Sequence, residues 1–103
     1  MLRCDNDYWV NSMPKFLAVH PMPKPVTIQE ATPLGKKARA LATLDAYWVQ
    51  SWAQLNEEGK IVKILCEWNA VDIGTLRKVI AKIPEMPCEG VYPMAKVDSE
   101  AFR

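Results

Sequence analysis

The chain has 103 residues, half of them hydrophobic, which is the size of one domain with enough apolar side chains to build its own core. Its 13 basic and 12 acidic residues leave a formal net charge of +1, and no concentrated basic stripe is present, which argues against nucleic-acid binding. The chain has neither an apolar run long enough to span a bilayer nor an opening signal-peptide pattern, so we expect a cytoplasmic protein with no membrane partner.

The first 12 residues show no periodic apolar pattern, and a strand-like segment follows Met13. We therefore divide the chain into an N-terminal extension or tail, residues 1–12, and one ferredoxin-like domain, residues 13–103. The first strand is predicted at residues 15–20. The proline-rich residues 21–25 that follow are expected to form a stiff, extended loop, because each proline ring fixes its own φ and restricts the residue before it.

The first helix has two possible starts. Thr27 and Glu30 have the spacing of a capping box, but a helix that began there would carry Pro33 in its interior. With Thr32 as the N-cap, Pro33 would take the first helical position, which proline favours. We therefore predict a short turn first and the main helix over residues 33–44.

The second helix is marked by its N-cap and by its apolar spacing. Asp72 is a good N-cap, and Pro84 should end the helix. The inward-facing side chains that recur at helical spacing are Ile73, Leu76, Val79, Ile80 and Ile83.

Between the helices, residues 46–55 and 60–70 are rich in β-branched and aromatic side chains, and an Asn-Glu-Glu-Gly break separates them. This pattern predicts a β-hairpin. Because side chains alternate between the two faces of a strand, one face should hold core residues such as Ile64, Cys66 and Trp68. The other face, called the open face below, is expected to carry Trp48, Gln50, Trp52, Lys63, Leu65 and Glu67.

A last strand is predicted at residues 88–97, with Pro93 at an edge or a bulge. The resulting order β-α-β-β-α-β predicts an α+β fold, a ferredoxin-like sandwich with two helices on one face of an antiparallel sheet.

Four segments also carry a family resemblance: Met13-Pro-Lys-Phe-Leu-Ala-Val-His20, Trp48-Val-Gln-Ser-Trp52, Cys66-Glu-Trp-Asn-Ala70 with Asp72, and Pro87-Cys-Glu-Gly-Val-Tyr92 followed by Val97-Asp98. Together they resemble small bacterial ferredoxin-like domains of unknown function that are related to nickel-binding proteins. The resemblance implies a homodimer, and in some relatives a bound metal. Only His20 lies at a position that matches a histidine of the family, so it is the metal ligand that the resemblance implies for nickel or another divalent ion.

His20 is the only histidine of the chain, and it ends the first predicted strand. Strand alternation places it on the open face with Trp48 and Trp52, close to Glu67 of the neighbouring strand. A histidine paired with a carboxylate can be oriented for proton transfer or for ligand binding. The alternative is a purely structural hydrogen bond at the end of the strand.

The three cysteines, Cys4, Cys66 and Cys88, lack the spacing of a metal site or of a secreted disulfide framework. Cys66 is expected to be a buried, inert thiol in the core, and Cys88 is expected to be exposed.

Three functions remain open. The first is a homodimer of the dimeric α/β-barrel type that encloses a small molecule or a metal ion at its open face. The second is a cofactor-independent enzyme of the same architecture, a monooxygenase or isomerase, with His20 as base and with Tyr92 or Gln50 polarising the substrate. The third is a structural interaction module whose cavity is filled by side chains. For the first, the predicted ligand-binding residues are His20, Trp48, Gln50, Trp52, Glu67 and Tyr92.

Overall fold

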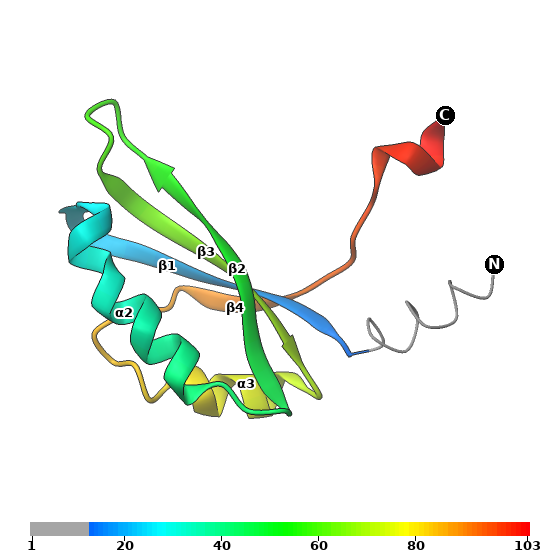
Figure 1. Ribbon diagram of the computed structural model, residues 1–103. Helices are drawn as coiled ribbons and strands as arrows, with labels where there is room; N and C mark the ends of the chain where they lie inside the picture. The colour runs from blue at the N-terminus through cyan, green and yellow to red at the C-terminus, as the bar shows by residue number, and fades with distance from the viewer. Residues whose placement is uncertain (1–12) are drawn as a thin grey trace.

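The computed structural model describes residues 13–103, which form a four-stranded sheet with two helices against one face (Figure 1). The proposed N-terminal tail, residues 1–12, lies outside the described residues. In chain order the elements are β1 Lys15–Val26, α2 Ile28–Leu41, β2 Ala46–Leu55, β3 Ile61–Ala70, α3 Ile73–Ile80, β4 Gly90–Met94 and the 3-10 helix η1 Ser99–Phe102.

The strands lie in the order β2-β3-β1-β4, and every neighbouring pair is antiparallel. The predicted α+β class is therefore confirmed, and the arrangement is compatible with a ferredoxin-like sandwich. At the edge of this sheet, β4 pairs with β1. Pro93 lies in this edge strand, as expected, because proline cannot donate a hydrogen bond to a second neighbour.

Strand β1 is longer than predicted, because it continues through the three prolines of residues 21–25. Its pairing with β3 is regular from Lys15 to Pro21, then shifts register and resumes where Val26 faces Ile61. Pro21 is the last regularly paired residue, and Pro23 and Pro25 lie in the irregular part of the ladder, where a missing backbone donor does least harm.

Helix α2 begins earlier than predicted. Thr27 is the N-cap, and its hydroxyl accepts a hydrogen bond from the Glu30 backbone N–H at 3.0 Å. In return the Glu30 carboxylate accepts from the Thr27 backbone N–H at 2.8 Å. The prediction of Thr32 as N-cap is wrong: this reciprocal capping box satisfies two N-terminal donors, and the helix accommodates Pro33 in its interior.

The other helix boundaries also refine the predictions. Asp72 caps α3 as expected, because its Oδ1 accepts a hydrogen bond from the Thr75 backbone N–H at 2.7 Å. Ile83 lies beyond the end of α3 and is still buried. Leu44, the last residue of the predicted first helix, lies beyond the end of α2 and is 91% exposed.

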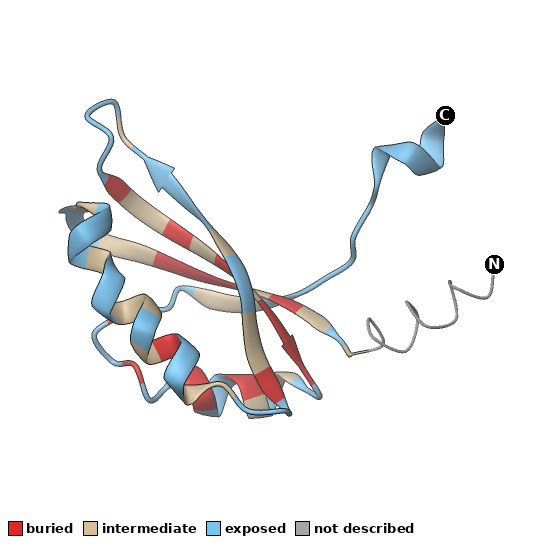
Figure 2. Cartoon of the chain, viewed as in Figure 1, coloured by how far each residue is buried: buried red, intermediate tan, exposed pale blue. Residues whose placement is uncertain are grey.

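The core lies between the two helices and the sheet face that they cover, as the distribution of buried residues in Figure 2 shows. Neither helix of residues 13–103 combines the length and the apolar content needed to cross a membrane. The buried residues at the centre of the core are Phe16, Ala18, Cys66 and Trp68 of the sheet and Leu76, Val79 and Ile80 of α3.

Candidate functional site

His20 lies on the sheet face that the helices cover. It pairs directly with Ile64 of β3, and two residues earlier Ala18 pairs with Cys66, another core residue. Directly opposed residues of an antiparallel pair project from the same face. Glu67 instead pairs with Leu17, on the open face. The prediction that His20 and Glu67 share a face is therefore wrong, and His20 shares its face with Cys66.

Trp48 also lies on the helix-covered face, because β2 contains a bulge. Trp48 pairs with Trp68, whereas Gln50 pairs with Glu67, so the pairing passes over Val49. One extra residue in a strand shifts the alternation of all side chains beyond it. The predicted place of Trp48 on the open face is therefore wrong.

The residues predicted to form one site thus divide between two faces of the sheet. His20 and Trp48 lie beneath the helices, whereas Gln50 and Trp52 lie on the open face as predicted. Tyr92 pairs with Leu17 and shares the open face. Neither Gln50 nor Tyr92 can therefore polarise a substrate held at His20.

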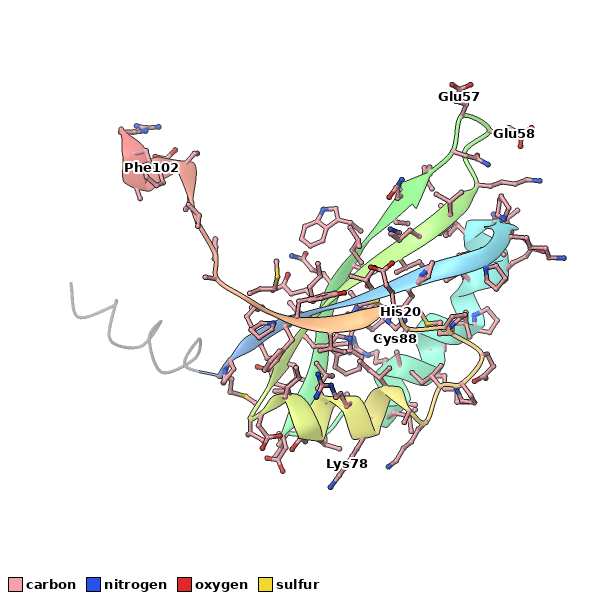
Figure 3. All side chains as sticks on the ribbon, turned by 180° about the vertical axis from the view of Figure 1, so that it is seen from behind. His20, Glu57, Glu58, Lys78, Cys88 and Phe102 are labelled. Carbon is pink, nitrogen blue, oxygen red and sulfur yellow. The ribbon has the colours of Figure 1, made fainter. Side chains whose placement is uncertain are left out.

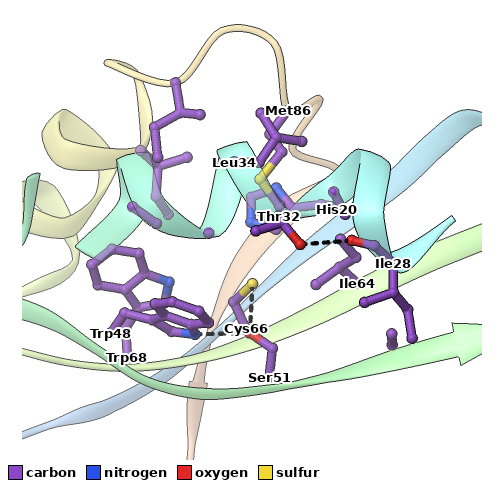
Figure 4. A pocket seen from close by; sticks show the side chains of 16 residues that line it. His20, Ile28, Thr32, Leu34, Trp48, Ser51, Ile64, Cys66, Trp68 and Met86 are labelled. Carbon is purple, nitrogen blue, oxygen red and sulfur yellow. Dashed lines mark hydrogen bonds between the residues drawn. The ribbon is translucent and has the colours of Figure 1, made fainter. Parts of the chain in front are cut away.

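Beneath α2 the core is not completely filled, and a cavity of about 270 Å³ remains between the helix and the sheet (Figure 4). Its more exposed lining residues are Ile28 and Thr32 of α2 and Ala53 of β2, so the mouth lies between the start of α2 and the end of β2. The cavity is lined by His20, Ile28, Ala31, Thr32, Leu34, Gly35, Ala38, Trp48, Ser51, Ala53, Ile64, Cys66, Trp68, Ile80, Ile83 and Met86.

The sequence of α2 explains why this space exists. Ala31, Gly35 and Ala38 recur at spacings of four and three, so they line the same face of the helix, and all three border the cavity. A Cβ on Gly35 would already lie 3.6 Å from the Trp48 ring, which is ordinary van der Waals contact. Larger side chains along this stripe would fill the cavity. Sequence reasoning missed the site because small residues in a helix do not by themselves signal a ligand.

A chain of polar contacts crosses the sheet side of the cavity. The Trp48 indole N–H donates to the Ser51 hydroxyl oxygen at 2.8 Å, and this hydroxyl donates to the Cys66 sulfur at 3.1 Å. Burial raises the pKa of the Cys66 thiol, which therefore stays protonated at neutral pH. The expectation of a buried Cys66 and an exposed Cys88 is confirmed.

His20 is only 4% exposed, and its Nδ1 lies 3.0 Å from the Pro87 carbonyl oxygen in the loop that leads to Cys88 (Figure 3). A carbonyl can only accept, so Nδ1 carries the proton and Nε2 carries the lone pair. Burial lowers the pKa of His20, although the hydrogen bond to Pro87 acts in the opposite direction. The imidazole is therefore neutral at neutral pH, and the structural hydrogen bond proposed as the alternative is observed.

Trp68 provides the least satisfied polar atom of the cavity lining. Its side chain is 2% exposed, and its indole N–H has no acceptor among residues 13–103. Buried polar groups in folded proteins are nearly always paired, because an unpaired buried donor loses its hydrogen bonds to water without replacement. From the sequence alone, Trp68 is predicted only as a core residue.

Glu67 forms a separate polar cluster on the open face. Its carboxylate accepts hydrogen bonds from the Lys15 ammonium and, at 2.9 Å, from the Gln50 amide. The hydrogen bond from Lys15 is the main cause that lowers the pKa of Glu67. A hollow of about 970 Å³ surrounds this cluster. Exposed apolar side chains on the same face belong to Val49, Trp52, Tyr92 and Met94.

Among residues 13–103 the structure places no three His, Cys, Asp or Glu side chains close enough together to hold a metal ion. The role of His20 as a metal ligand therefore stays a prediction.

Comparison of the chain with models of protein families, with curated proteins and with solved structures finds no match. The resemblance to nickel-binding ferredoxin-like domains stays a prediction, and function is inferred below from the two faces of the sheet.

Proposed function

We propose that the protein binds a small organic molecule in the cavity between α2 and the sheet, and that it forms a homodimer through the opposite face of the sheet. The observation that carries the proposal is the cavity itself, about 270 Å³ of largely apolar space inside a small domain. Protein interiors are close-packed and leave few voids larger than a water molecule. Binding pockets, by contrast, are typically apolar concavities with a few placed polar groups, and His20, Ser51 and Trp68 are such groups here.

An organic ligand fits these residues better than a metal ion does. The cavity contributes one imidazole and one thiol, and burial keeps the thiol of Cys66 protonated. Divalent metals bind thiolates and usually need three or four ligands. Nickel binding through His20 would therefore require ligands that the cavity lining does not supply.

Binding is also better supported than catalysis. A general base needs a group that orients it and a substrate within hydrogen-bond reach. Here the Pro87 carbonyl orients His20 by accepting a hydrogen bond from Nδ1–H, but burial lowers the pKa of the ring, and the carboxylate of Glu67, which could stabilise its protonated form, lies across the sheet. An enzyme with His20 as its base remains the second candidate, because the Nε2 lone pair is free of that hydrogen bond.

The homodimer is supported by the apolar character of the open face. When one face of an antiparallel sheet is left to solvent, it is usually polar. Here Trp52 is 56% exposed, and Val49, Tyr92 and Met94 are each 44% or 45% exposed. A second copy that packs its own open face there would bury all four and would give the dimeric α/β-barrel arrangement expected from the sequence. That arrangement leaves the cavity beneath α2 accessible on the far side of each sheet.

The binding proposal can be tested with two small probes, ethylbenzene and acetophenone, which have nearly the same shape. Each is titrated into nitrogen-labelled full-length protein, and the indole N–H signals are followed in a proton–nitrogen correlation spectrum. We expect saturable shifts of the Trp48 and Trp68 signals and little change for Trp52, which faces away from the cavity.

A matched pair of variants locates the site. Ala38→Leu fills the cavity and should abolish the shifts, whereas Ala40→Leu lies on the exposed side of the same helix and should leave them unchanged. Native mass spectrometry of the purified protein shows in addition whether a molecule co-purifies. The proposal is wrong if neither probe binds, or if both bind equally well to the Ala38→Leu variant.

A further inference from the structure

We infer that the molecule held beneath α2 is uncharged and carries an oxygen atom, such as that of a carbonyl, that accepts a hydrogen bond from the indole N–H of Trp68. This inference rests on the proposed function and specifies the chemical class of its ligand. Three observations support it: the charge of the lining, the hydrogen bonds already made there, and the size of the cavity.

The lining offers nothing to balance a charge. None of the described residues around the cavity is an Asp, Glu, Lys or Arg. Burial lowers the pKa of His20 and raises the pKa of Cys66, so both side chains are neutral at neutral pH. An ion that entered this space would lose its hydration without gaining a counter-charge, which is strongly unfavourable.

Most polar groups of the lining are already paired within the protein. The Trp48 indole donates to Ser51, and the Ser51 hydroxyl donates to Cys66. The Thr32 hydroxyl donates to the Ile28 carbonyl oxygen at 3.0 Å. None of these donors needs a ligand to satisfy it.

Trp68 is different, because its indole N–H is a buried donor that lacks an acceptor among the described residues. An indole nitrogen can donate but cannot accept. The group it calls for is therefore an acceptor. The Nε2 atom of His20 cannot fill this role for a ligand oxygen, because with Nδ1 protonated it carries a lone pair and would repel a carbonyl. The ligand oxygen is therefore assigned to Trp68.

A single water molecule would leave most of the cavity empty. Water occupies roughly 30 Å³ of liquid volume and is held stably by two to four polar partners. The cavity of about 270 Å³ is several times larger, and most other polar groups around it are already paired. An organic molecule with an apolar body and one oxygen satisfies Trp68 and fills the remaining apolar space.

The test compares ethylbenzene with acetophenone, which differ mainly in the carbonyl oxygen, and adds benzoate as a charged analogue. Because ethylbenzene is the more hydrophobic, the informative quantity is the ratio of the two dissociation constants, measured in the unmodified protein and in Trp68→Phe. In Trp68→Phe, which lacks the donor, acetophenone should bind about tenfold more weakly relative to ethylbenzene, the size expected for one buried hydrogen bond. The ratio should not change in Trp52→Phe, which loses an indole from the open face.

The unmodified protein supplies a readout that does not depend on a variant folding. Acetophenone should move the Trp68 indole proton signal downfield, as a new hydrogen bond does, and ethylbenzene should not. An unchanged ratio in Trp68→Phe, an unmoved Trp68 signal at saturating acetophenone, or benzoate binding as tight as that of acetophenone would overturn this inference while the ligand proposal stands. If neither neutral probe binds, the proposed function falls and this inference falls with it.

Discussion

The Nδ1 atom of His20 lies 3.0 Å from the carbonyl oxygen of Pro87, and this contact ties the middle of β1 to the loop that precedes β4. His20 also lines the cavity, so the same imidazole forms part of the cavity wall and holds this loop by a hydrogen bond. Protonation of the buried ring would place a charge in an apolar setting, so the folded state favours the neutral form.

The first prediction is that the free energy of unfolding falls as the pH is lowered below the ordinary histidine pKa of 6.5. The pKa of His20 is lower in the folded state than in the unfolded state, so the unfolded chain binds the proton more readily in this range. The loss should be at most about 1.4 kcal/mol per pH unit. Urea unfolding at about pH 7.5, 6.5 and 5.5 measures it.

His20→Gln is the control, since it removes the only histidine of the chain. The carboxylates with lowered pKa values, Glu30, Glu67, Asp72 and Glu85, should lose their stabilising effect only as the pH falls through and below their ordinary pKa values, 4.5 for the glutamates and 3.8 for Asp72. The slope between about pH 6.5 and 5.5 should therefore disappear in the variant. A slope that persists there would show that another group titrates.

The face of β1 could not be predicted from the sequence, for a physical reason. Alternation identifies the buried face of a strand only when the other face is polar. Residues 16–19 are Phe, Leu, Ala and Val, all apolar, and because β1 lies between β3 and β4, even Val19 on the open face is only 7% exposed. Strand alternation therefore predicts the wrong face for His20, although the strand and its first residue are predicted correctly.

The bulge at Val49 could not be predicted from the sequence either. Tyr47, Trp48, Val49 and Gln50 contain no glycine or proline that would mark a break in pairing. The hairpin, its loop and the open-face positions of Gln50, Trp52 and Glu67 were predictable from residue type and spacing. Trp48 was misplaced because a single extra residue reverses the face of every side chain on the far side of it.

The second prediction concerns Ser51, which links Trp48 to Cys66 beside the cavity. Ser51→Ala should destabilise the fold by about 1 kcal/mol, because the Trp48 indole N–H loses its acceptor. For a domain of this size that corresponds to a fall in Tm of roughly 4–8 °C. Ser99→Ala, in the exposed 3-10 helix η1, should leave Tm unchanged. Equal melting curves for the two variants would show that the link contributes nothing.

The third prediction is that Cys88 reacts with iodoacetamide at least about ten times faster than Cys66. Cys88 is exposed, whereas Cys66 is buried and its pKa is raised by that burial. Peptide mapping by mass spectrometry distinguishes the two sites in the full chain. Saturating acetophenone should slow Cys66 further and leave Cys88 unaffected, since only Cys66 lines the cavity. Comparable rates for both thiols would contradict the packing described for Cys66.

The fourth prediction is a homodimer that depends on Trp52. The side chain is 56% exposed on the open face, beside the cluster of Lys15, Gln50 and Glu67. Light scattering at tens of micromolar should give the mass of a dimer. Truncating a central aromatic residue of an interface typically costs about 2 kcal/mol or more, so Trp52→Ala should weaken dimerisation by roughly thirtyfold.

Leu44→Ala supplies the matched control for this prediction. Leu44 is more exposed than Trp52, at 91%, but it lies in the connection between α2 and β2 and not on the open face. If exposure of any large apolar side chain drives self-association, both variants should weaken the dimer equally. If the open face is the interface, only Trp52→Ala should weaken the dimer. Binding of acetophenone beneath α2 should persist in the resulting monomer, because the cavity lies on the other side of the sheet. A monomeric mass for the unmodified protein would rule out the interface.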